Sequence, residues 1–162
     1  MVNVNTIQSG TVFAWFMFMI IIRRLVMLGV AMHAGRGKPF PPGSRPPEDS
    51  KLTRVKIQKT PTTTTNEIEF TRDVRVNRVI HNDTENDPYF FILLLSTAIF
   101  SDRSNCTRTI VYGLLYLIIR ILYAIAYIMA FQPWRSIIYA FGLALTLACS
   151  LDFVITMSMQ PN

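Results

Sequence analysis

The chain has 162 residues, of which 51% are hydrophobic and 16% charged, with a formal net charge of +6. Soluble domains carry about a quarter charged residues, so this composition argues against an entirely soluble protein. The basic excess comes without a basic-aromatic motif, and we therefore expect no nucleic-acid partner.

The hydrophobic residues gather in stretches that predict membrane-spanning helices. Such a helix needs about 20 predominantly apolar residues. The stretches predict four spans, at about 11–34, 75–100, 108–130 and 135–157. The expected fold is all-α: a polytopic membrane protein whose single domain, residues 1–162, is a four-helix transmembrane bundle.

The first span contains Arg23 and Arg24. A cleaved signal peptide would begin with a basic region, whereas residues 1–10 carry no charged side chain and the arginines follow the apolar run. We therefore expect a retained span.

The segment 35–73 predicts an irregular connection rather than a second domain, because it is rich in Pro, Gly and Thr. Its basic residues favour the cytosolic side of the membrane. This places the loop in the cytosol and both termini in the lumen. The residues concerned are Arg36, Lys38, Arg45, Lys51, Arg54, Lys56, Lys59 and Arg72.

The second span reaches the required length only by including the polar stretch RVIHNDTEND, residues 78–87. Steps of three and four residues put a polar stripe on one face of this helix: Arg75, Arg78, Asn82, Glu85 and Tyr89. Charge inside a membrane usually faces the bundle interior or a wet cavity and marks a function. The alternative is a solvated lead-in to the span. Asp83 lies away from the stripe, and we expect it to pair with Arg24.

The third span carries a similar row: Tyr112, Tyr116, Arg120, Tyr123 and Tyr127. An uncompensated arginine in mid-span costs about 2.5–3.5 kcal/mol on insertion scales. Tyrosines alone indicate bundle packing, but tyrosines beside a buried arginine favour a polar seam. In the fourth span we expect Asp152 to reach the lumenal surface.

The cysteines, Cys106 and Cys149, lack metal-ligand spacing, so we expect packing residues and no metal site.

Together the stripes offer guanidinium groups, one carboxylate, one amide and phenols. Arginine binds carboxylates in a bidentate fashion, and a lone glutamate suits an ammonium group. Glutathione has two carboxylates, a free amine and a thiol, and it matches this set. A cationic neighbour would favour its thiolate.

Three blocks carry a resemblance to a known family. They are RVxRxxxNDxEN (75–86), RxxxxxAY (120–127) with RSxxY (135–139) after it, and Arg36 followed by PED (47–49). The chain resembles the membrane-associated proteins in eicosanoid and glutathione metabolism, the MAPEG family. The similarity points to the branch of microsomal glutathione transferases and prostaglandin E synthases.

The resemblance implies a homotrimer with glutathione, as co-substrate, held between subunits near the cytosolic side. It implies that Arg36, Arg78, Asn82, Glu85 and Tyr127 bind glutathione. It also implies that Arg135, with Arg120, lies near the sulfur and holds it as the thiolate. Arg75 and Tyr123 from the stripes, and Ser136 and Tyr139 from RSxxY, complete the predicted set.

The chain departs from the family pattern at several positions. Ile80 stands where a histidine is usual, Asn77 where a second arginine is frequent, and Tyr123 where a histidine is frequent. The neighbouring His81 either replaces the missing ligand contact or points at solvent. These departures put the substrate class in question.

The predicted function is a membrane-bound glutathione transferase that conjugates the thiolate to hydrophobic electrophiles and also reduces lipid hydroperoxides. One alternative is a glutathione-dependent isomerase of the prostaglandin E synthase kind. Another alternative is a non-catalytic lipid-binding or scaffold protein. An anion channel is a weaker alternative than either. The expected partners are glutathione, a lipophilic electrophile or lipid hydroperoxide, membrane lipid and two further copies of the chain. The expected location is the endoplasmic reticulum membrane, with the mitochondrial outer membrane as a second site.

Overall fold

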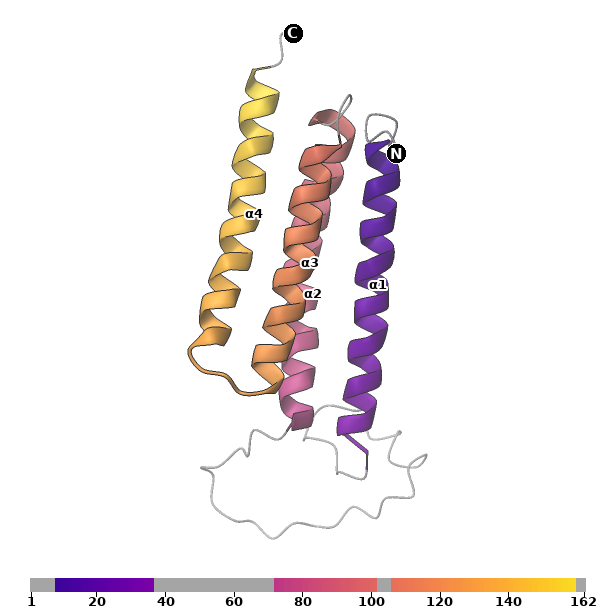
Figure 1. Ribbon diagram of the computed structural model, residues 1–162, viewed down its shortest axis with the longest axis vertical. Coiled ribbons are helices and arrows are strands. Elements are labelled where there is room, and N and C mark those ends of the chain that lie inside the picture. Colours follow the sequence, from indigo (N-terminus) through magenta and orange to yellow (C-terminus); the bar gives the residue numbers. More distant parts are fainter. Residues whose placement is uncertain (1–7, 37–71, 102–105, 160–162) are drawn as a thin grey trace, which may run out of the picture.

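The computed structural model describes residues 8–36, 72–101 and 106–159. Four long helices run alternately up and down, and Figure 1 shows the start of the first and the end of the last at the same end of the bundle. In the described residues all regular structure is helical, as the all-α prediction requires. The helices are α1 (Ser9–Ala34), α2 (Arg72–Ser96), α3 (Thr107–Ile128) and α4 (Trp134–Ser158), and a π-helical turn, η3 (Thr97–Ser101), continues α2.

Each expected span overlaps one of these helices. Helices α1, α3 and α4 are long and apolar enough to cross a membrane. Helix α2 differs because its first half is polar, and it begins at Arg72 rather than near Arg75. Most of the predicted 35–73 connection lies outside the described residues, and its cytosolic side stays a prediction.

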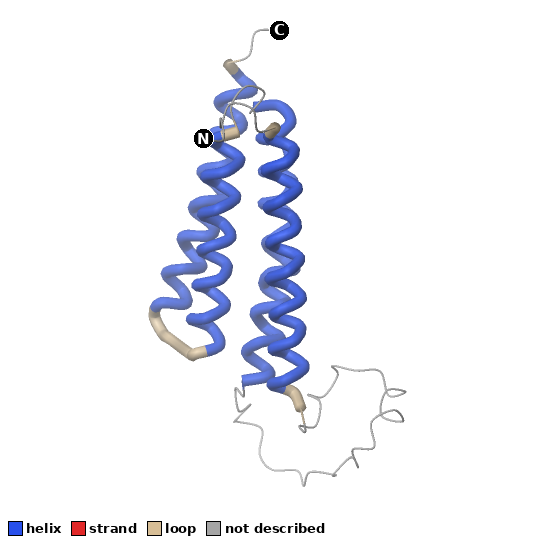
Figure 2. Tube along the Cα trace, turned by 45° about the vertical axis from the view of Figure 1, so that its right-hand side comes forward, coloured by secondary structure: helices blue, strands red, loops and turns tan. Residues whose placement is uncertain are grey.

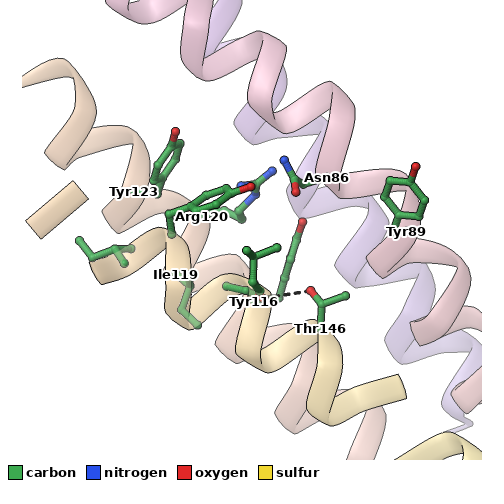
Figure 3. Close-up of a pocket in the computed structure, with 11 residues that line it drawn as sticks. Asn86, Tyr89, Tyr116, Ile119, Arg120, Tyr123 and Thr146 are labelled. Atoms are coloured by element: carbon green, nitrogen blue, oxygen red, sulfur yellow. Dashed lines mark hydrogen bonds between the residues drawn. The ribbon is translucent and has the colours of Figure 1, made fainter. Parts of the chain in front are cut away.

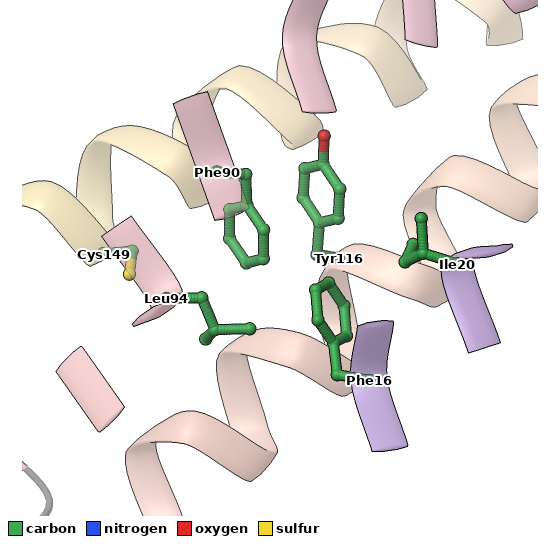
Figure 4. Close-up of a cluster of buried hydrophobic side chains, with 6 residues drawn as sticks. All are labelled: Phe16, Ile20, Phe90, Leu94, Tyr116 and Cys149. Atoms are coloured by element: carbon green, nitrogen blue, oxygen red, sulfur yellow. The ribbon is translucent and has the colours of Figure 1, made fainter. Parts of the chain in front are cut away.

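The apolar core joins all four helices around two stacked rings. Phe90 of α2 and Tyr116 of α3 lie parallel with their ring centroids 3.8 Å apart. Helix α3 comes close here because Gly113 has no side chain: a Cβ atom would meet Phe16 Cδ2 at 3.2 Å. Figure 4 shows the full cluster of Phe16, Ile20, Phe90, Leu94, Tyr116 and Cys149.

Both cysteines act as packing residues, as predicted. Cys106 and Cys149 are free and buried. The sulfur of Cys149 lies 3.9 Å from the hydroxyl of Thr97.

Helix α4 is the least embedded of the four. Cys149 is its one buried residue, whereas α2 and α3 each bury seven. In Figure 1 α2 and α3 lie in the middle, with α1 on one side and α4 on the other, and in Figure 2 α3 and α4 diverge toward the short loop that joins them. Its large apolar side chains, Phe141, Leu147 and Leu151 among them, are exposed. Such a surface suits lipid or another protein chain.

A second apolar cluster lies toward the end where α1 finishes and α2 begins. It contains Met27, Val76, Val79, Tyr123 and Ala124. The rings of Tyr127 and Tyr139 pack against it. The tyrosines of the predicted seam therefore enter the core here.

The other end of the bundle is held by polar contacts. Ser9 donates to the carbonyl of Ala98 at 2.7 Å. Arg108 lies 3.6 Å from the carboxylate of Asp152 and donates to the hydroxyl of Thr156. The sequence predicted that Asp152 simply reaches the surface. Instead it pairs with Arg108 at the start of α3.

Candidate functional site

Two carboxylates lie in the middle of the buried face of α2. This face follows helical steps of three and four residues. It consists of Asp73, Val76, Val79, Asp83, Asp87, Phe90 and Leu94. Because Asp83 and Asp87 stand between fully buried apolar residues, they must find cationic partners inside the bundle.

The partners are two arginines, and together the four side chains form the charge quartet: Arg23, Asp83, Asp87 and Arg120. Arg23 Nη2 lies 3.0 Å from an oxygen of each carboxylate. Arg120 Nε lies 3.0 Å from Asp87, and Nη2 lies 3.3 Å from Asp83. The quartet balances two positive with two negative charges, which explains how α1, α2 and α3 carry charge in mid-bundle.

The expected pairing of Asp83 with Arg24 is wrong. Arg23 makes this contact because it follows buried Ile20 by three residues and precedes buried Met27 by four, on the inner face of α1. One residue further the helix has turned by about 100°. Arg24 is therefore exposed and donates instead to the hydroxyl of Thr84 at 3.2 Å.

Arg120 also donates two hydrogen bonds to Asn82. Nη1 donates to the side-chain oxygen Oδ1 at 3.0 Å, and Nη2 donates to the backbone carbonyl at 3.2 Å. On its other flank, the Tyr116 hydroxyl donates to Asp87 at 2.8 Å. Arg120 is therefore enclosed by partners, with its side chain 5% exposed.

An aromatic row connects the quartet with the start of α4. The guanidinium carbon of Arg120 lies 5.8 Å from the ring centre of Tyr123. Tyr123 in turn contacts the rings of Tyr127 and Tyr139, at 5.7 and 6.0 Å between centroids. Arg135 lies over Tyr127 at 4.7 Å. Two guanidinium groups thus border one patch of phenols, and cations over such rings are attracted to them.

A cavity of about 270 Å³ opens beside this row, between α2, α3 and α4. Figure 3 shows Tyr116, Arg120 and Tyr123 projecting from α3 beside Asn86 and Tyr89 of α2. The lining residues are Asn86, Tyr89, Tyr116, Ile119, Arg120, Tyr123, Ile138, Tyr139, Gly142, Leu143 and Thr146. The wall is mainly apolar with a few polar groups, as is usual for sites that take small organic molecules.

The predicted site residues divide into two groups. The structure brings together Asn82, Arg120, Tyr123, Tyr127, Arg135 and Tyr139. A second group lies on the outside of the chain or only partly buried: Arg36, Arg75, Arg78, His81, Glu85 and Ser136.

On that outer side, His81 Nδ1 lies 3.2 Å from Glu85 Oε1, with both side chains more than half exposed. A cation therefore already accompanies Glu85 whenever the imidazole is protonated. Of the polar stripe of α2, Arg78 and Glu85 face outward in the single chain, whereas Asn82 contacts Arg120 and Tyr89 lines the cavity.

Sequence reasoning missed several residues around the site. Asp87 had a signal, because it follows Asp83 by four residues and precedes apolar Phe90 and Leu94 at helical spacing. The cavity residues Gly142, Leu143 and Thr146 of α4 had none, since a small or apolar residue in a spanning helix is ordinary.

The described residues hold no cluster of three or more His, Cys, Asp or Glu side chains that could bind a metal ion. The donor set around the cavity consists of guanidinium, phenol and amide groups instead, which suit an organic anion.

The fold and this site define a class: a multi-pass membrane protein with a polar seam inside its helix bundle. The sequence profile of the MAPEG family matches residues 9–154, so the chain belongs to the MAPEG family. No individual curated protein matches the sequence significantly. Membership confirms the membrane fold and associates the protein with glutathione or eicosanoid metabolism in general.

Proposed function

We propose that the protein is a membrane-bound glutathione transferase that adds the glutathione sulfur to hydrophobic electrophiles. The observation that carries this proposal is that Arg135 lies over Tyr127, whose ring contacts Tyr123 in the wall of a mainly apolar cavity. A transferase of this kind needs an anionic sulfur and a lipophile next to each other. The row supplies cationic and phenolic groups, and the cavity supplies apolar surface.

Thiolate supply limits the uncatalysed reaction, because a thiol with a pKa of about 8.5 is only a few per cent ionised at neutral pH. A guanidinium beside the sulfur stabilises the charged form and lowers the pKa of the thiol. We assign this role to Arg135, whose charge is not engaged by the quartet. Arg120 was expected to share it, but its charge is already balanced by Asp83 and Asp87.

The polar stripe of α2 supports the trimer as part of the proposal. Arg78 and Glu85 face outward, so a ligand bound to them would lie at the surface of one chain. A neighbouring copy packed on this face would enclose the ligand and exclude water. The exposed apolar residues of α4 would meet lipid, and a lipophile dissolved in the bilayer would approach the cavity from there. The cytosolic side of the site and the endoplasmic reticulum location belong to the same proposal.

In the proposed reaction the thiolate attacks an electrophilic carbon, a carbon–sulfur bond forms, and the leaving group departs with the electron pair. For a lipid hydroperoxide, two glutathione molecules would be oxidised to the disulfide while the peroxide is reduced to the alcohol and water.

The test begins with calorimetric titration of the purified, detergent-solubilised protein with glutathione. We expect saturable heat and an ultraviolet difference spectrum of a bound thiolate. Turnover of an aryl halide such as chlorodinitrobenzene would then support the transferase. Absence of binding heat would contradict it and favour the lipid-binding or scaffold alternative.

The isomerase remains a second candidate because Tyr139 of the RSxxY block lies in the cavity wall. Such an enzyme would convert an endoperoxide into a hydroxyketone without consuming glutathione. Incubation with an endoperoxide and with the aryl halide, side by side, separates the two reactions. Asp49 of the PED block, which also resembles the prostaglandin synthase sequence, lies outside the described residues.

A further inference from the structure

We propose that Asp87 and Arg120 are positioning residues that orient the carboxamide of Asn82 so that its NH₂ group faces the ligand. The inference rests on the proposed function, because it names how the glutathione site selects an anionic group. It extends beyond the predicted site, since Asp87 does not line the cavity and would act only through Arg120.

The orientation of Asn82 follows from the chemistry of its partner. A guanidinium has only N–H donors and no acceptor. The carboxamide atom 3.0 Å from Arg120 Nη1 must therefore be the oxygen, Oδ1. The NH₂ group occupies the other branch of the carboxamide and is turned away from Arg120. Asn82 thus offers a donor on the polar stripe of α2, and a donor selects a carboxylate or carbonyl oxygen.

A second amide is oriented in the complementary sense. Asn86 Nδ2 donates to the backbone carbonyl of Asn82 at 2.8 Å. Because a carbonyl only accepts, the nitrogen of Asn86 must face it, and the oxygen lies on the other branch. Asn86 lines the cavity. One turn of α2 therefore presents a fixed donor and a fixed acceptor, which suits a ligand carrying both a carboxylate and an N–H group, as an amino-acid-like end does.

Arg120 can hold Asn82 because its own position is held from several sides. Nε donates to Asp87 at 3.0 Å, and Nη2 lies 3.3 Å from Asp83. The rings of Tyr116 and Tyr123 flank the guanidinium, at 5.5 and 5.8 Å from its carbon to the ring centres. Asp87→Asn keeps one acceptor oxygen for Nε but removes the negative charge, so the bond weakens and the plane of the guanidinium is held less firmly.

The matched substitution is Asn82→Asp. It keeps an oxygen for Arg120 and nearly the same shape, but it replaces the outward NH₂ by a second oxygen. If Asn82 presents a donor to a ligand carboxylate, this change weakens glutathione binding by about 100-fold, since a charged hydrogen bond is lost and a repulsion gained. If Asn82 serves only to brace Arg120, the affinity stays within about twofold of the wild type.

The role of Asp87 is tested by a double-mutant cycle on the full chain, with the dissociation constant of glutathione measured by calorimetry. We expect Asp87→Asn to weaken binding about five- to tenfold on its own, because Arg120, and through it Asn82, is held less firmly in one orientation. We expect less than about a twofold further effect when Asn82 is already Ala. Arg24→Gln, at the neighbouring arginine outside the quartet, is the control and should leave the affinity unchanged.

A purely structural role would give a different pattern, in which the losses from Asp87→Asn and Asn82→Ala multiply. That result overturns the inference while leaving the proposed function intact. If Asp87→Asn does not fold, the charge-balanced pair Arg23→Gln with Asp87→Asn replaces it in the cycle, because one cation and one anion remain. Failure of the wild-type protein to bind glutathione would overturn the proposed function, and the inference with it.

Discussion

The two faces of α2 differ in how their charged side chains are buried and paired. On the inner face, Asp83 and Asp87 are almost fully buried and meet two arginines within the chain. On the outer face, Glu85 is more than half exposed and has a single histidine neighbour. The difference indicates that the inner charges hold helices together, whereas the outer charges lie at the surface of the chain. Both faces belong to one 25-residue helix.

The largest expected effect is a loss of stability, which we expect from a substitution on the inner face of α2 and not from one on the outer face. Asp87→Ala leaves the two arginines of the quartet with one carboxylate, and removal of one partner from a buried ion pair costs about 3–5 kcal/mol. We expect a marked fall in the thermal unfolding midpoint in detergent. Replacing Asp87 by Leu together with Arg23→Met should restore much of the loss, because the remaining pair is neutral again. The outer-face control, Glu85→Gln, should change stability by less than about 0.5 kcal/mol.

The second prediction concerns Arg135, which lies over Tyr127 and is not part of the charge quartet. Arg135→Ala should raise the pKa of bound glutathione by about two units, equivalent to about 2.7 kcal/mol, because the positive charge beside the sulfur is lost. The raised pKa lowers the thiolate fraction at neutral pH from most of the bound molecules to a few per cent. Ultraviolet difference spectra recorded against pH measure this shift.

Binding of glutathione itself should persist in Arg135→Ala. Arg108→Ala, at the other end of the bundle, is the matched control and should keep the thiolate signal. An undiminished thiolate band in Arg135→Ala would remove Arg135 from the mechanism.

The third prediction tests whether Glu85, on the outer face of α2, binds the ammonium group of glutathione. Glu85→Gln should weaken glutathione binding about tenfold, because the ligand ammonium loses a charged partner. The wild-type protein and the variant should bind N-acetylglutathione equally well, since its amine no longer carries charge. A tenfold difference that persists with the acetylated ligand would show that Glu85 contacts some other group.

The smallest effect compares two glycines, Gly113 at the inner face of α2 and Gly142 of α4 next to Ile119 of α3. In Gly113→Ala the new methyl group would lie 3.2 Å from Phe16 and 3.4 Å from Leu94 of the inner face. We expect a loss of about 1 kcal/mol in stability, because the core must shift to accept it. In Gly142→Ala the nearest atom, on Ile119, lies at 3.5 Å, which is ordinary contact. Equal unfolding midpoints for the two variants would contradict the close packing of α3 against α1 and α2.

Helices α1, α3 and α4 were predictable from length and apolar composition, whereas α2 was predicted by extending a short apolar run into a polar stretch with helical spacing. The buried tyrosine and arginine row of α3 was also predictable, since its helical spacing leaves one stripe that is polar. Arg120 is indeed buried between tyrosines.

The partner of Asp83 was beyond sequence reasoning, because Arg23 and Arg24 are adjacent and only the rotation of α1 in the bundle selects one of them. The cavity also could not be predicted from the sequence. It depends on how α4 lies against α2 and α3, and apolar residues such as Leu143 fit a lipid-facing or a cavity-facing position equally well. The outer stripe was identified by its spacing, but a single chain leaves its ligand roles as proposals.

The charge quartet has a consequence for the synthesis of the protein. Arg23 is made 64 residues before Asp87, and Arg120 follows 33 residues after that carboxylate. The first helix therefore leaves the ribosome with a cation whose counter-ion does not yet exist. Until the next segment arrives, the lipid must be shielded from this guanidinium by water, headgroups or the insertion machinery. We therefore expect cooperative biogenesis of the bundle, with lateral release of the first three helices into the bilayer delayed until the third has emerged.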